Sequence, residues 1–344
     1  ERLRAKRGIP GISATIVFPD GSTWEGTAGM ADVAVGEPVT TDTAFPAASV
    51  SKTFTSALIL GLVEDGRLSL DSRVRTYLPD LAIDRAITVR QLLDHTSGLR
   101  DFYFHPSIDR ALLTRPARVW DAKRTLKYVR KSLVKPGVAW GYSNTNYLVL
   151  GMLAEAVGEG SVAQQLRARF LDPLGLDHTW YQGVDAPRGP LAHGFRFLGV
   201  DPTLSAIDLS DGTSVAPFTS VVTASGAAGS IAMTATDLAR WGRALYDGPA
   251  LTDASRAAML DDVVRTAPYR PTVPYGLGVQ ATTIGDRLAL GHSGRFLGAR
   301  SSIRWLPEQE VSIAVLTNQS RSDPAPIVAN LLKFLLGPAA PVVP

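Results

Sequence analysis

The chain has 344 residues, a formal net charge of +3, 45% hydrophobic and 19% charged residues, and no cysteine. The lack of cysteine excludes disulfides, thiolate catalysis and cysteine metal sites, and the small net charge without a basic run gives no support for a nucleic-acid partner. No apolar run approaches the roughly 20 residues of a membrane span, so the chain should form one large or two interdigitated globular domains.

The N-terminal region predicts a β-hairpin. Residues 11–29 read GISATIVFPDGSTWEGTAG, with alternating apolar residues on both sides of a Pro-Asp-Gly turn at 19–21. An Asp-Gly pair between alternating segments is a strong hairpin signal.

Helical spacing dominates the middle of the chain, and strand spacing returns near the C-terminus. The predicted helices cover residues 53–66, 88–99, 121–133, 144–160, 234–248 and 252–264. From about residue 274 the period changes to two, and the predicted strands are YGLGVQATT, RLALGHSG, ARSSIRWLP and QEVSIAVLTNQ. A last helix is predicted at APIVANLLKFLLG.

This order of elements predicts an α+β fold of the α/β sandwich type. One antiparallel sheet, flanked by terminal helices, would form from both chain ends, residues 1–40 and 265–344. Residues 41–264 would form an inserted, mainly helical subdomain, and we expect the active site between the two parts.

The segment FPAASVSKTFTSALIL (45–60) places a lysine at the start of an almost wholly apolar helix, although helix N-termini favour anions. Ser49 and Lys52 are three residues apart and therefore share one helical face. A serine needs an adjacent base to become a nucleophile, and a lysine among apolar neighbours is biased towards its neutral, basic form. The alternative is an N-cap serine with a lysine that reaches solvent. The apolar helix after Lys52 favours a position in a cleft.

A second motif, YSN at 142–144, precedes another largely apolar helix. Tyr142 could supply a phenol oxygen as a proton shuttle, and Asn144 could orient a substrate carbonyl and hold Lys52. The alternative is an ordinary turn in which Asn144 caps the helix.

A third motif, GHSG at 291–294, ends a predicted strand. Two glycines around polar residues on a strand suggest the close approach of another backbone or a ligand. The alternative is a hairpin turn with an incidental histidine. Ser301 follows a little further along.

The three motifs occur in the order S-x-x-K, Y-x-N, H-S-G. With this set of motifs the chain resembles the serine β-lactamase and DD-peptidase superfamily. It is most similar to the branch of class C β-lactamases and Streptomyces-type DD-carboxypeptidases, which includes related esterases. The similarity extends over FPAASVSKTFTS, GRLSLDSRVRTYLP, ITVRQLLDHTSGL, YSNTNYLVLGMLAEAVG, GAAGSIAMTATDLARW and YGLGV. The resemblance implies a bacterial serine acyl hydrolase that forms an acyl-enzyme with an ester, a D-amino-acid amide or peptide, or a β-lactam.

The resemblance also implies roles for the matching residues. Ser49 would be the nucleophile, Lys52 and Tyr142 would share the general-base work, and Asn144 would orient the substrate. Backbone N–H groups of Ser49 and Arg295 would form the oxyanion hole. The remaining substrate-binding and electrostatic positions would be His292, Ser293, Gly294 and Arg295.

The chain also departs from the family pattern. His292 stands where many members carry lysine, and we expect it to titrate near neutrality. Ser293 keeps a hydroxyl that can bind a carboxylate. The carboxypeptidase branch has arginines after its YGLG segment, whereas this chain has VQATT, so Arg295 is the candidate replacement anchor. This departure disfavours strict DD-carboxypeptidase activity, and the lack of an assignable deacylating glutamate means that efficient β-lactam turnover does not follow.

Two other site types are excluded by sequence. GHSGR is close to the G-x-S-x-G elbow of α/β-hydrolases, but no histidine follows Ser293 to complete that triad. None of the five histidines has an i, i+4 partner and H-E-x-x-H is absent, so we expect neither a metal nor an organic cofactor.

Several alternatives stay open at this point. The chain could be a DD-carboxypeptidase or an acyltransferase acting on cell-wall or D-amino-acid peptides, or a non-catalytic module that binds peptidoglycan peptides. The expected partner is a small-molecule or peptide substrate, and the oligomeric state is open. The resemblance favours a periplasmic or secreted location, with a cytoplasmic one also open.

Overall fold

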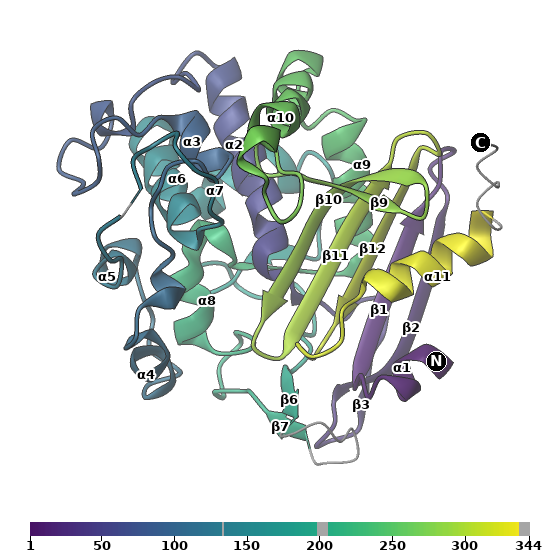
Figure 1. The fold of residues 1–344 in the computed structure, drawn as a ribbon. Helices are drawn as coiled ribbons and strands as arrows, with labels where there is room; N and C mark the ends of the chain where they lie inside the picture. Colours follow the sequence, from purple (N-terminus) through teal and green to yellow (C-terminus); the bar gives the residue numbers. More distant parts are fainter. Residues whose placement is uncertain (133, 198–205, 337–344) are drawn as a thin grey trace.

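The computed structural model describes residues 1–132, 134–197 and 206–336. Its centre is a seven-stranded antiparallel sheet in the order β3-β2-β1-β12-β11-β10-β9 (Figure 1). The strands are β1 (Gly11–Val17), β2 (Thr23–Asp32), β3 (Glu37–Pro38), β9 (Gln280–Ile284), β10 (Arg287–Phe296), β11 (Ala299–Leu306) and β12 (Val311–Thr317). The prediction of one sheet built from both ends of the chain is therefore confirmed.

The two ends of the chain meet in the middle of this sheet, where β1 pairs with β12. Ile16 lies opposite Ile313 in this antiparallel pair. Side chains alternate between the two faces of a strand, and on β12 both faces are covered: Ile313 and Val315 join one apolar cluster, and Ala314 and Leu316 join another. An unbroken apolar run is typical of a strand buried on both sides.

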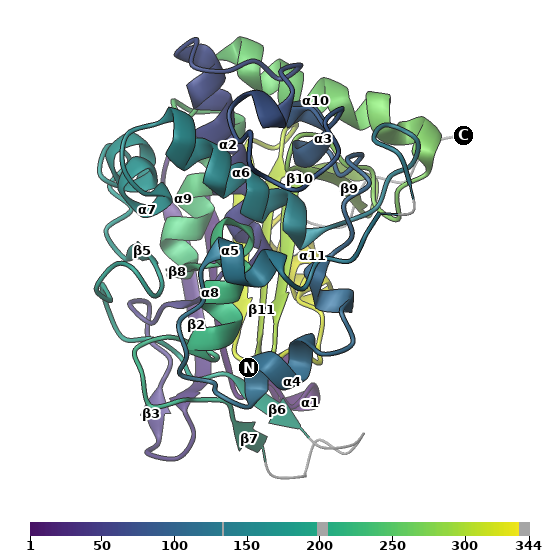
Figure 2. The ribbon, with the colours of Figure 1, turned by 90° about the vertical axis from the view of Figure 1, so that its left-hand side faces the viewer.

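Helices cover both faces of the sheet, which gives the layered arrangement seen in Figures 1 and 2. The terminal helices α1 (Arg2–Lys6) and α11 (Ala325–Leu336) lie on one face, and α9 (Ala235–Tyr246) lies on the other. Helix α2 (Ser51–Glu64) is buried around its whole circumference from Ser51 to Leu62, as expected for a helix that is apolar on all sides. None of the described helices is long and apolar enough to cross a lipid bilayer.

The remaining elements lie between the two halves of the sheet in the sequence. The α-helices are α3 (Val89–Leu93), α4 (Ile108–Leu113), α5 (Ala122–Leu126), α6 (Asn144–Val157), α7 (Val162–Leu166), α8 (Thr219–Ser225) and α10 (Asp253–Thr266). The short strands are β4 (Phe45–Pro46), β5 (Thr179–Tyr181), β6 (Phe195–Phe197), β7 (Ala206–Asp208) and β8 (Ile231–Met233). The short 3₁₀-helices are η1 (Ala48–Val50), η2 (Val74–Thr76), η3 (Phe102–Phe104), η5 (Gly226–Ala228) and η6 (Ala267–Tyr269), and η4 (Arg167–Leu171) is a π-helix.

Several of the predicted elements are shorter than the sequence suggested. The helix expected at 121–133 ends at Leu126. The helix expected at 88–99 ends at Leu93. The strand expected from YGLG begins only at Gln280, after the left-handed Gly278. The predicted ends at Leu133 and Gly337 lie outside the described residues.

Candidate active site

The nucleophile segment lies in the turn η1, directly before α2. Ala48 has φ +48°, a left-handed conformation that is uncommon for residues other than glycine and that clusters at functional sites. Strand β10 passes this turn closely, since a Cβ atom at Gly294 would lie 2.3 Å from Ala47 O and 2.2 Å from Ser301 Oγ. Ser301 Oγ donates to Ala47 O at 2.6 Å. Glycine at position 294 is therefore what allows the third motif to approach Ser49.

Lys52 is fully buried beneath Ser49. Its Nζ lies 3.0 Å from Ser49 Oγ, 2.7 Å from Asn144 Oδ1 and 2.9 Å from Ala228 O. Burial lowers the pKa of Lys52 to about 7, although the nearby Asp101 charge acts in the opposite direction. A large fraction of the amine is therefore neutral near pH 7, and neutral Nζ can accept the Ser49 proton.

Asn144 is held by a carboxylate that the sequence analysis did not assign to the site. Asp101 Oδ2 accepts hydrogen bonds from Asn144 Nδ2 at 2.7 Å and from Asn144 N at 3.1 Å. This arrangement turns Asn144 Oδ1 towards Lys52. Asp101 precedes Asn144 by 43 residues, and no local motif connects the two.

Tyr142 lies next to Ser49 and Lys52. Lys52 Nζ is 5.1 Å from the centre of its ring. Burial raises the pKa of Tyr142 far above its usual value, and its interaction with the Ser49 side chain only partly opposes this effect. The phenol is therefore neutral at physiological pH and can donate a proton.

His292 is also buried, and its hydrogen bonds define its tautomer. Nδ1 lies 2.7 Å from Ser293 O, and Nε2 lies 3.0 Å from Tyr275 Oη. The carbonyl requires a donor, so Nδ1 carries the hydrogen and Nε2 accepts from Tyr275. Burial, and after it the Lys52 charge, lower the pKa of His292 to about 3. The expectation that His292 titrates near neutrality is therefore wrong, because the site excludes the water that a charged imidazole needs.

A buried arginine on the neighbouring strand β11 supplies a positive charge that the sequence analysis missed. Arg304 is only 7% exposed, and its Nη2 donates to Ser293 Oγ at 2.5 Å and to Gln280 Oε1 at 3.3 Å. Burial lowers its pKa to about 10, so the guanidinium stays charged at neutral pH. No carboxylate among the described residues forms an ion pair with Arg304. Gln280, the first residue of β9, accepts from Ser293 N at 3.0 Å.

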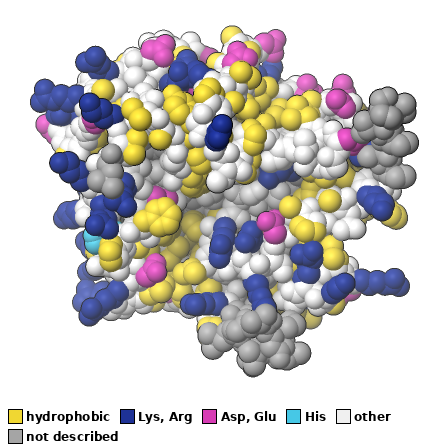
Figure 3. Space-filling view, viewed as in Figure 1, with side chains coloured by type: hydrophobic (Ala, Val, Ile, Leu, Met, Phe, Trp, Pro, Cys, Tyr) yellow, Lys and Arg dark blue, Asp and Glu magenta, His cyan; other side chains and the backbone are white. Residues whose placement is uncertain are grey.

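The structure brings all three motifs to one cavity of about 560 Å³. Figure 3 shows a hollow on this face between the helices and the sheet, with Lys and Arg side chains beside it. The predicted site residues that line the cavity are Ser49, Tyr142, Asn144, His292, Ser293, Gly294 and Arg295. The eighth, Lys52, lies beneath it. Residues not predicted for the site complete the lining, namely Tyr103, Asp109, Leu112, Leu113, Val221, Gln280, Phe296, Leu297, Arg300 and Ser320.

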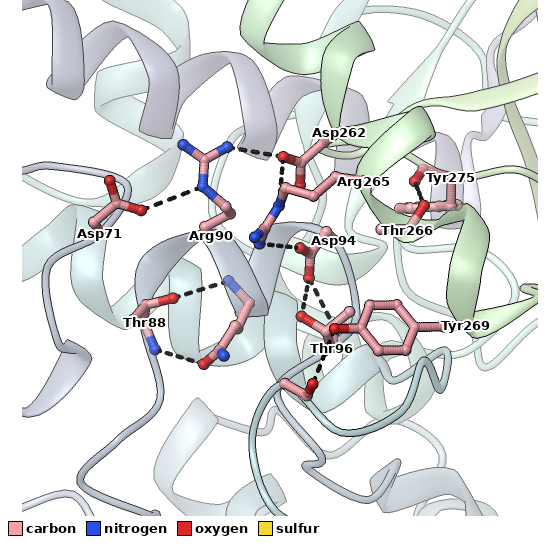
Figure 4. A network of polar contacts seen from close by, with 12 residues as sticks. Asp71, Thr88, Arg90, Asp94, Thr96, Asp262, Arg265, Thr266, Tyr269 and Tyr275 are labelled. Carbon is pink, nitrogen blue, oxygen red and sulfur yellow. Dashed lines mark hydrogen bonds and ion pairs between the residues drawn. The ribbon is translucent and has the colours of Figure 1, made fainter.

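A network of charged side chains, in which the carboxylates of Asp94 and Asp262 are buried, joins α3 to α10 (Figure 4). Arg265 contacts Asp94 Oδ2 at 3.2 Å and Asp262 Oδ1 at 3.1 Å, and Arg90 contacts Asp262 Oδ1 at 2.8 Å. Burial raises the pKa of Asp94 to about 7, and the nearby Asp262 adds to the effect. Asp94 therefore titrates in the same pH range as Lys52.

One group of residues in the described part of the chain has the spacing of metal ligands. Ligand atoms of Asp32, His193 and Asp208 all lie within 4.8 Å of one another. His193 Nδ1 is 2.8 Å from Asp208 Oδ2 and 3.5 Å from Asp32 Oδ2. Ordinary histidine–carboxylate contacts account for this group, and none of its members lines the cavity around Ser49.

Comparison with known proteins identifies the family to which a chain with this site belongs. The family model described as Beta-lactamase matches residues 1–337. The chain belongs to the beta-lactamase family. This beta-lactamase-family chain is 30% identical to penicillin-binding protein 4 of Amycolatopsis lactamdurans, covering 99% of this chain and 89% of that protein. It is 26% identical to a D-aminopeptidase of Cereibacter sphaeroides, covering 97% of this chain and 61% of that protein.

Among solved structures, the family member is similar to a D-stereospecific amidohydrolase from Streptomyces sp. The two share 27% sequence identity and a TM-score of 0.82, covering 98% of this chain and 97% of the other. The similarity to hydrolases of this family extends over nearly the whole chain. The beta-lactamase-family chain is therefore a serine acyl hydrolase of the β-lactamase type.

Proposed function

We propose that the chain hydrolyses amide and ester bonds of D-amino-acid derivatives through an acyl-enzyme on Ser49. The observation that carries this proposal is the 3.0 Å contact between Ser49 Oγ and Lys52 Nζ. The lowered pKa of Lys52, about 7, makes this amine a base at neutral pH.

In the first half of the reaction, Ser49 Oγ bonds to the substrate carbonyl carbon and its proton passes to Lys52 Nζ. The C–N or C–O bond of the substrate then breaks. The neutral Tyr142 phenol donates its proton to the leaving group and regains one from Lys52. In the second half, water attacks the acyl ester and returns a proton to Ser49 by the reverse route.

The developing oxyanion would be bound by the backbone N–H groups of Ser49 and Arg295. Ser293 N donates to Gln280, on the side of β10 that faces β9. N–H groups two residues apart on a strand point to the same side, so the N–H of Arg295 faces that side too. The register between β9 and β10 ends at Gly291, which leaves this edge unpaired and supports the assignment.

The similar proteins and the cavity support the proposed substrate class. One similar protein is named a D-aminopeptidase and another a D-stereospecific amidohydrolase, and both names indicate a preference for D-configured substrates. Asp109 is an exposed carboxylate in the cavity lining and forms no ion pair within the described part of the chain. It can bind the α-ammonium group of such a substrate. Leu112, Leu113 and Val221 offer an apolar wall for its side chain.

A substrate panel with intact-protein mass spectrometry tests the proposal. The panel holds D- and L-phenylalanine amide, p-nitrophenyl butyrate, nitrocefin and a D-Ala-D-Ala peptide. We expect an acyl adduct on Ser49 and a preference of about tenfold or more for the D-amide over the L-amide. A non-catalytic peptide-binding module would give no adduct with any substrate or with a fluorophosphonate, and equal rates for the enantiomers would refute the substrate class.

The Asp109→Asn variant tests the proposed ammonium site. We expect KM for D-phenylalanine amide to rise about fivefold, because an exposed ion pair contributes about 1 kcal/mol. Hydrolysis of p-nitrophenyl butyrate, which has no ammonium group, should not change. Asp286→Asn, in the turn between β9 and β10, is the matched control. An unchanged KM for the amide would remove Asp109 from the site.

A second candidate function is favoured by Arg304. Because Arg304 donates to Ser293 Oγ, the Ser293 hydroxyl hydrogen is free to bind an anionic substrate group, with a positive charge behind it. This arrangement suits a substrate with a terminal carboxylate, as in a DD-carboxypeptidase. Preference for the D-Ala-D-Ala peptide in the panel would support this function over amide hydrolysis.

A further inference from the structure

We propose that His95 is a positioning residue for acyl transfer, holding Tyr142 beside Ser49 and Tyr275 beside His292. This inference rests on the proposed function. His95 lies outside the three motifs, in the sequence DHTSGL (94–99). It is fully buried and has φ +66°, a left-handed conformation that is uncommon for residues other than glycine, although histidine adopts it more readily than most. Costly conformations of this kind persist where the surrounding structure requires them.

The backbone and side chain of His95 hold the segment that carries Tyr142 from both sides. His95 O accepts a hydrogen bond from Gly141 N at 2.9 Å, and His95 Nδ1 accepts one from Ser143 N at 3.2 Å. These two donors flank Tyr142 in the sequence. Any change that moves either acceptor of His95 therefore moves the Tyr142 backbone.

The imidazole of His95 has one possible tautomer. Nδ1 accepts from Asn146 Nδ2 at 3.1 Å as well as from Ser143 N. Two N–H donors at Nδ1 require that the ring hydrogen is on Nε2. Nε2 has no hydrogen-bond partner among the described residues. Burial, and after it the Lys52 charge, lower the pKa of His95 well below its usual value, so the ring stays uncharged.

This uncharged ring contacts both phenols that matter to the site. Its centroid is 4.4 Å from that of Tyr142 and 4.8 Å from that of Tyr275. Tyr142 lies beside the nucleophile, and Tyr275 donates to His292 Nε2. One side chain thus sets the spacing between the second and third motifs.

Two variants separate this positioning role from a merely structural one. His95→Asn keeps an acceptor for Ser143 N and tolerates a left-handed backbone, but it removes the ring. His95→Gly keeps only the carbonyl. Active sites are counted with a fluorophosphonate, and kcat and KM for p-nitrophenyl butyrate are measured per active site. His105→Asn, on a histidine outside the cavity lining, is the control.

We expect kcat per active site to fall about 10-fold in His95→Asn and about 10²-fold in His95→Gly, with KM within about twofold of wild type, because small misplacements of reacting groups mainly reduce kcat. His105→Asn should match wild type. A merely structural role would reduce the number of titrated sites and the melting temperature but leave kcat per site unchanged. An unchanged kcat per active site would overturn the inference and leave the proposed function intact. If His95→Gly does not fold, the result for His95→Asn alone decides. A wild-type chain without a Ser49 adduct would overturn both.

Discussion

The Ser49→Ala variant should lose hydrolysis of p-nitrophenyl esters by about 10⁴-fold or more, because it lacks the only atom proposed to carry the acyl group. Lys52→Ala should lose about 10²- to 10⁴-fold, the usual contribution of a general base. The rate of p-nitrophenol release at saturating substrate is measured for both variants and for wild type. Thermal unfolding of Ser49→Ala should match that of wild type, since Ser49 lines a cavity rather than the core.

The matched control for Ser49→Ala is Ser51→Ala. Ser51 lies two residues further along, and its Oγ accepts from Ile231 N at 3.1 Å outside the cavity. This variant should be less stable than wild type but should form the acyl adduct at the normal rate. Wild-type ester hydrolysis by Ser49→Ala would show that another group is the nucleophile.

The second large effect concerns pH. We expect kcat/KM to rise about tenfold per pH unit up to about pH 7 and then level off, so that the value at pH 5 is about 100-fold below the plateau. The reason is that protonated Lys52, whose pKa is about 7, cannot accept the Ser49 proton. His292, with a pKa of about 3, stays neutral across this range and adds no limb. The measurement is a kcat/KM profile for p-nitrophenyl butyrate from pH 5 to 9.

Asp94 provides the control, because burial raises its pKa to about 7 as well. Asp94→Asn removes this titration but keeps an oxygen that can accept from Thr96, which now donates to Asp94 Oδ1 at 2.9 Å. The activity limb should remain near pH 7 in this variant. The role assigned to Lys52 would be contradicted if kcat/KM of the Asp94→Asn variant no longer rose with pH, or if kcat/KM of the wild type did not change with pH.

The parts of the fold and site that the sequence predicted are those encoded by local spacing. Alternating apolar residues and a Pro-Asp-Gly turn predicted the hairpin of β1 and β2, and Ser49 and Lys52 are neighbours because three residues separate them on a helical turn. The convergence of the three motifs followed from the family resemblance rather than from any periodicity. The division into residues 1–40 with 265–344 and residues 41–264 stays a prediction.

The missed residues act through contacts that no local pattern encodes. Asp101 orients Asn144 from 43 residues away, and Arg304 reaches Ser293 because β10 and β11 are paired with a particular register. The charge state of His292 was mispredicted for the same reason, since burial is a property of the assembled cleft. His95 lies in the segment DHTSGL, which belongs to the family resemblance. Its left-handed backbone and its contacts with Tyr142 and Tyr275 appear only in the folded structure.

The pairing of β1 with β12 has a consequence for how the protein is made. A ribosome releases β1 long before its partner strand Val311–Thr317, because most of this sequence lies between paired residues such as Ile16 and Ile313. Strand β1 therefore keeps an open edge until the long intervening segment and β12 have left the exit tunnel. Pairing across such a long sequence separation is slow, and until it occurs hydrophobic surface and an unpaired strand edge stay exposed. The nascent protein should accordingly depend on chaperones more than a protein of equal size whose neighbouring strands are consecutive.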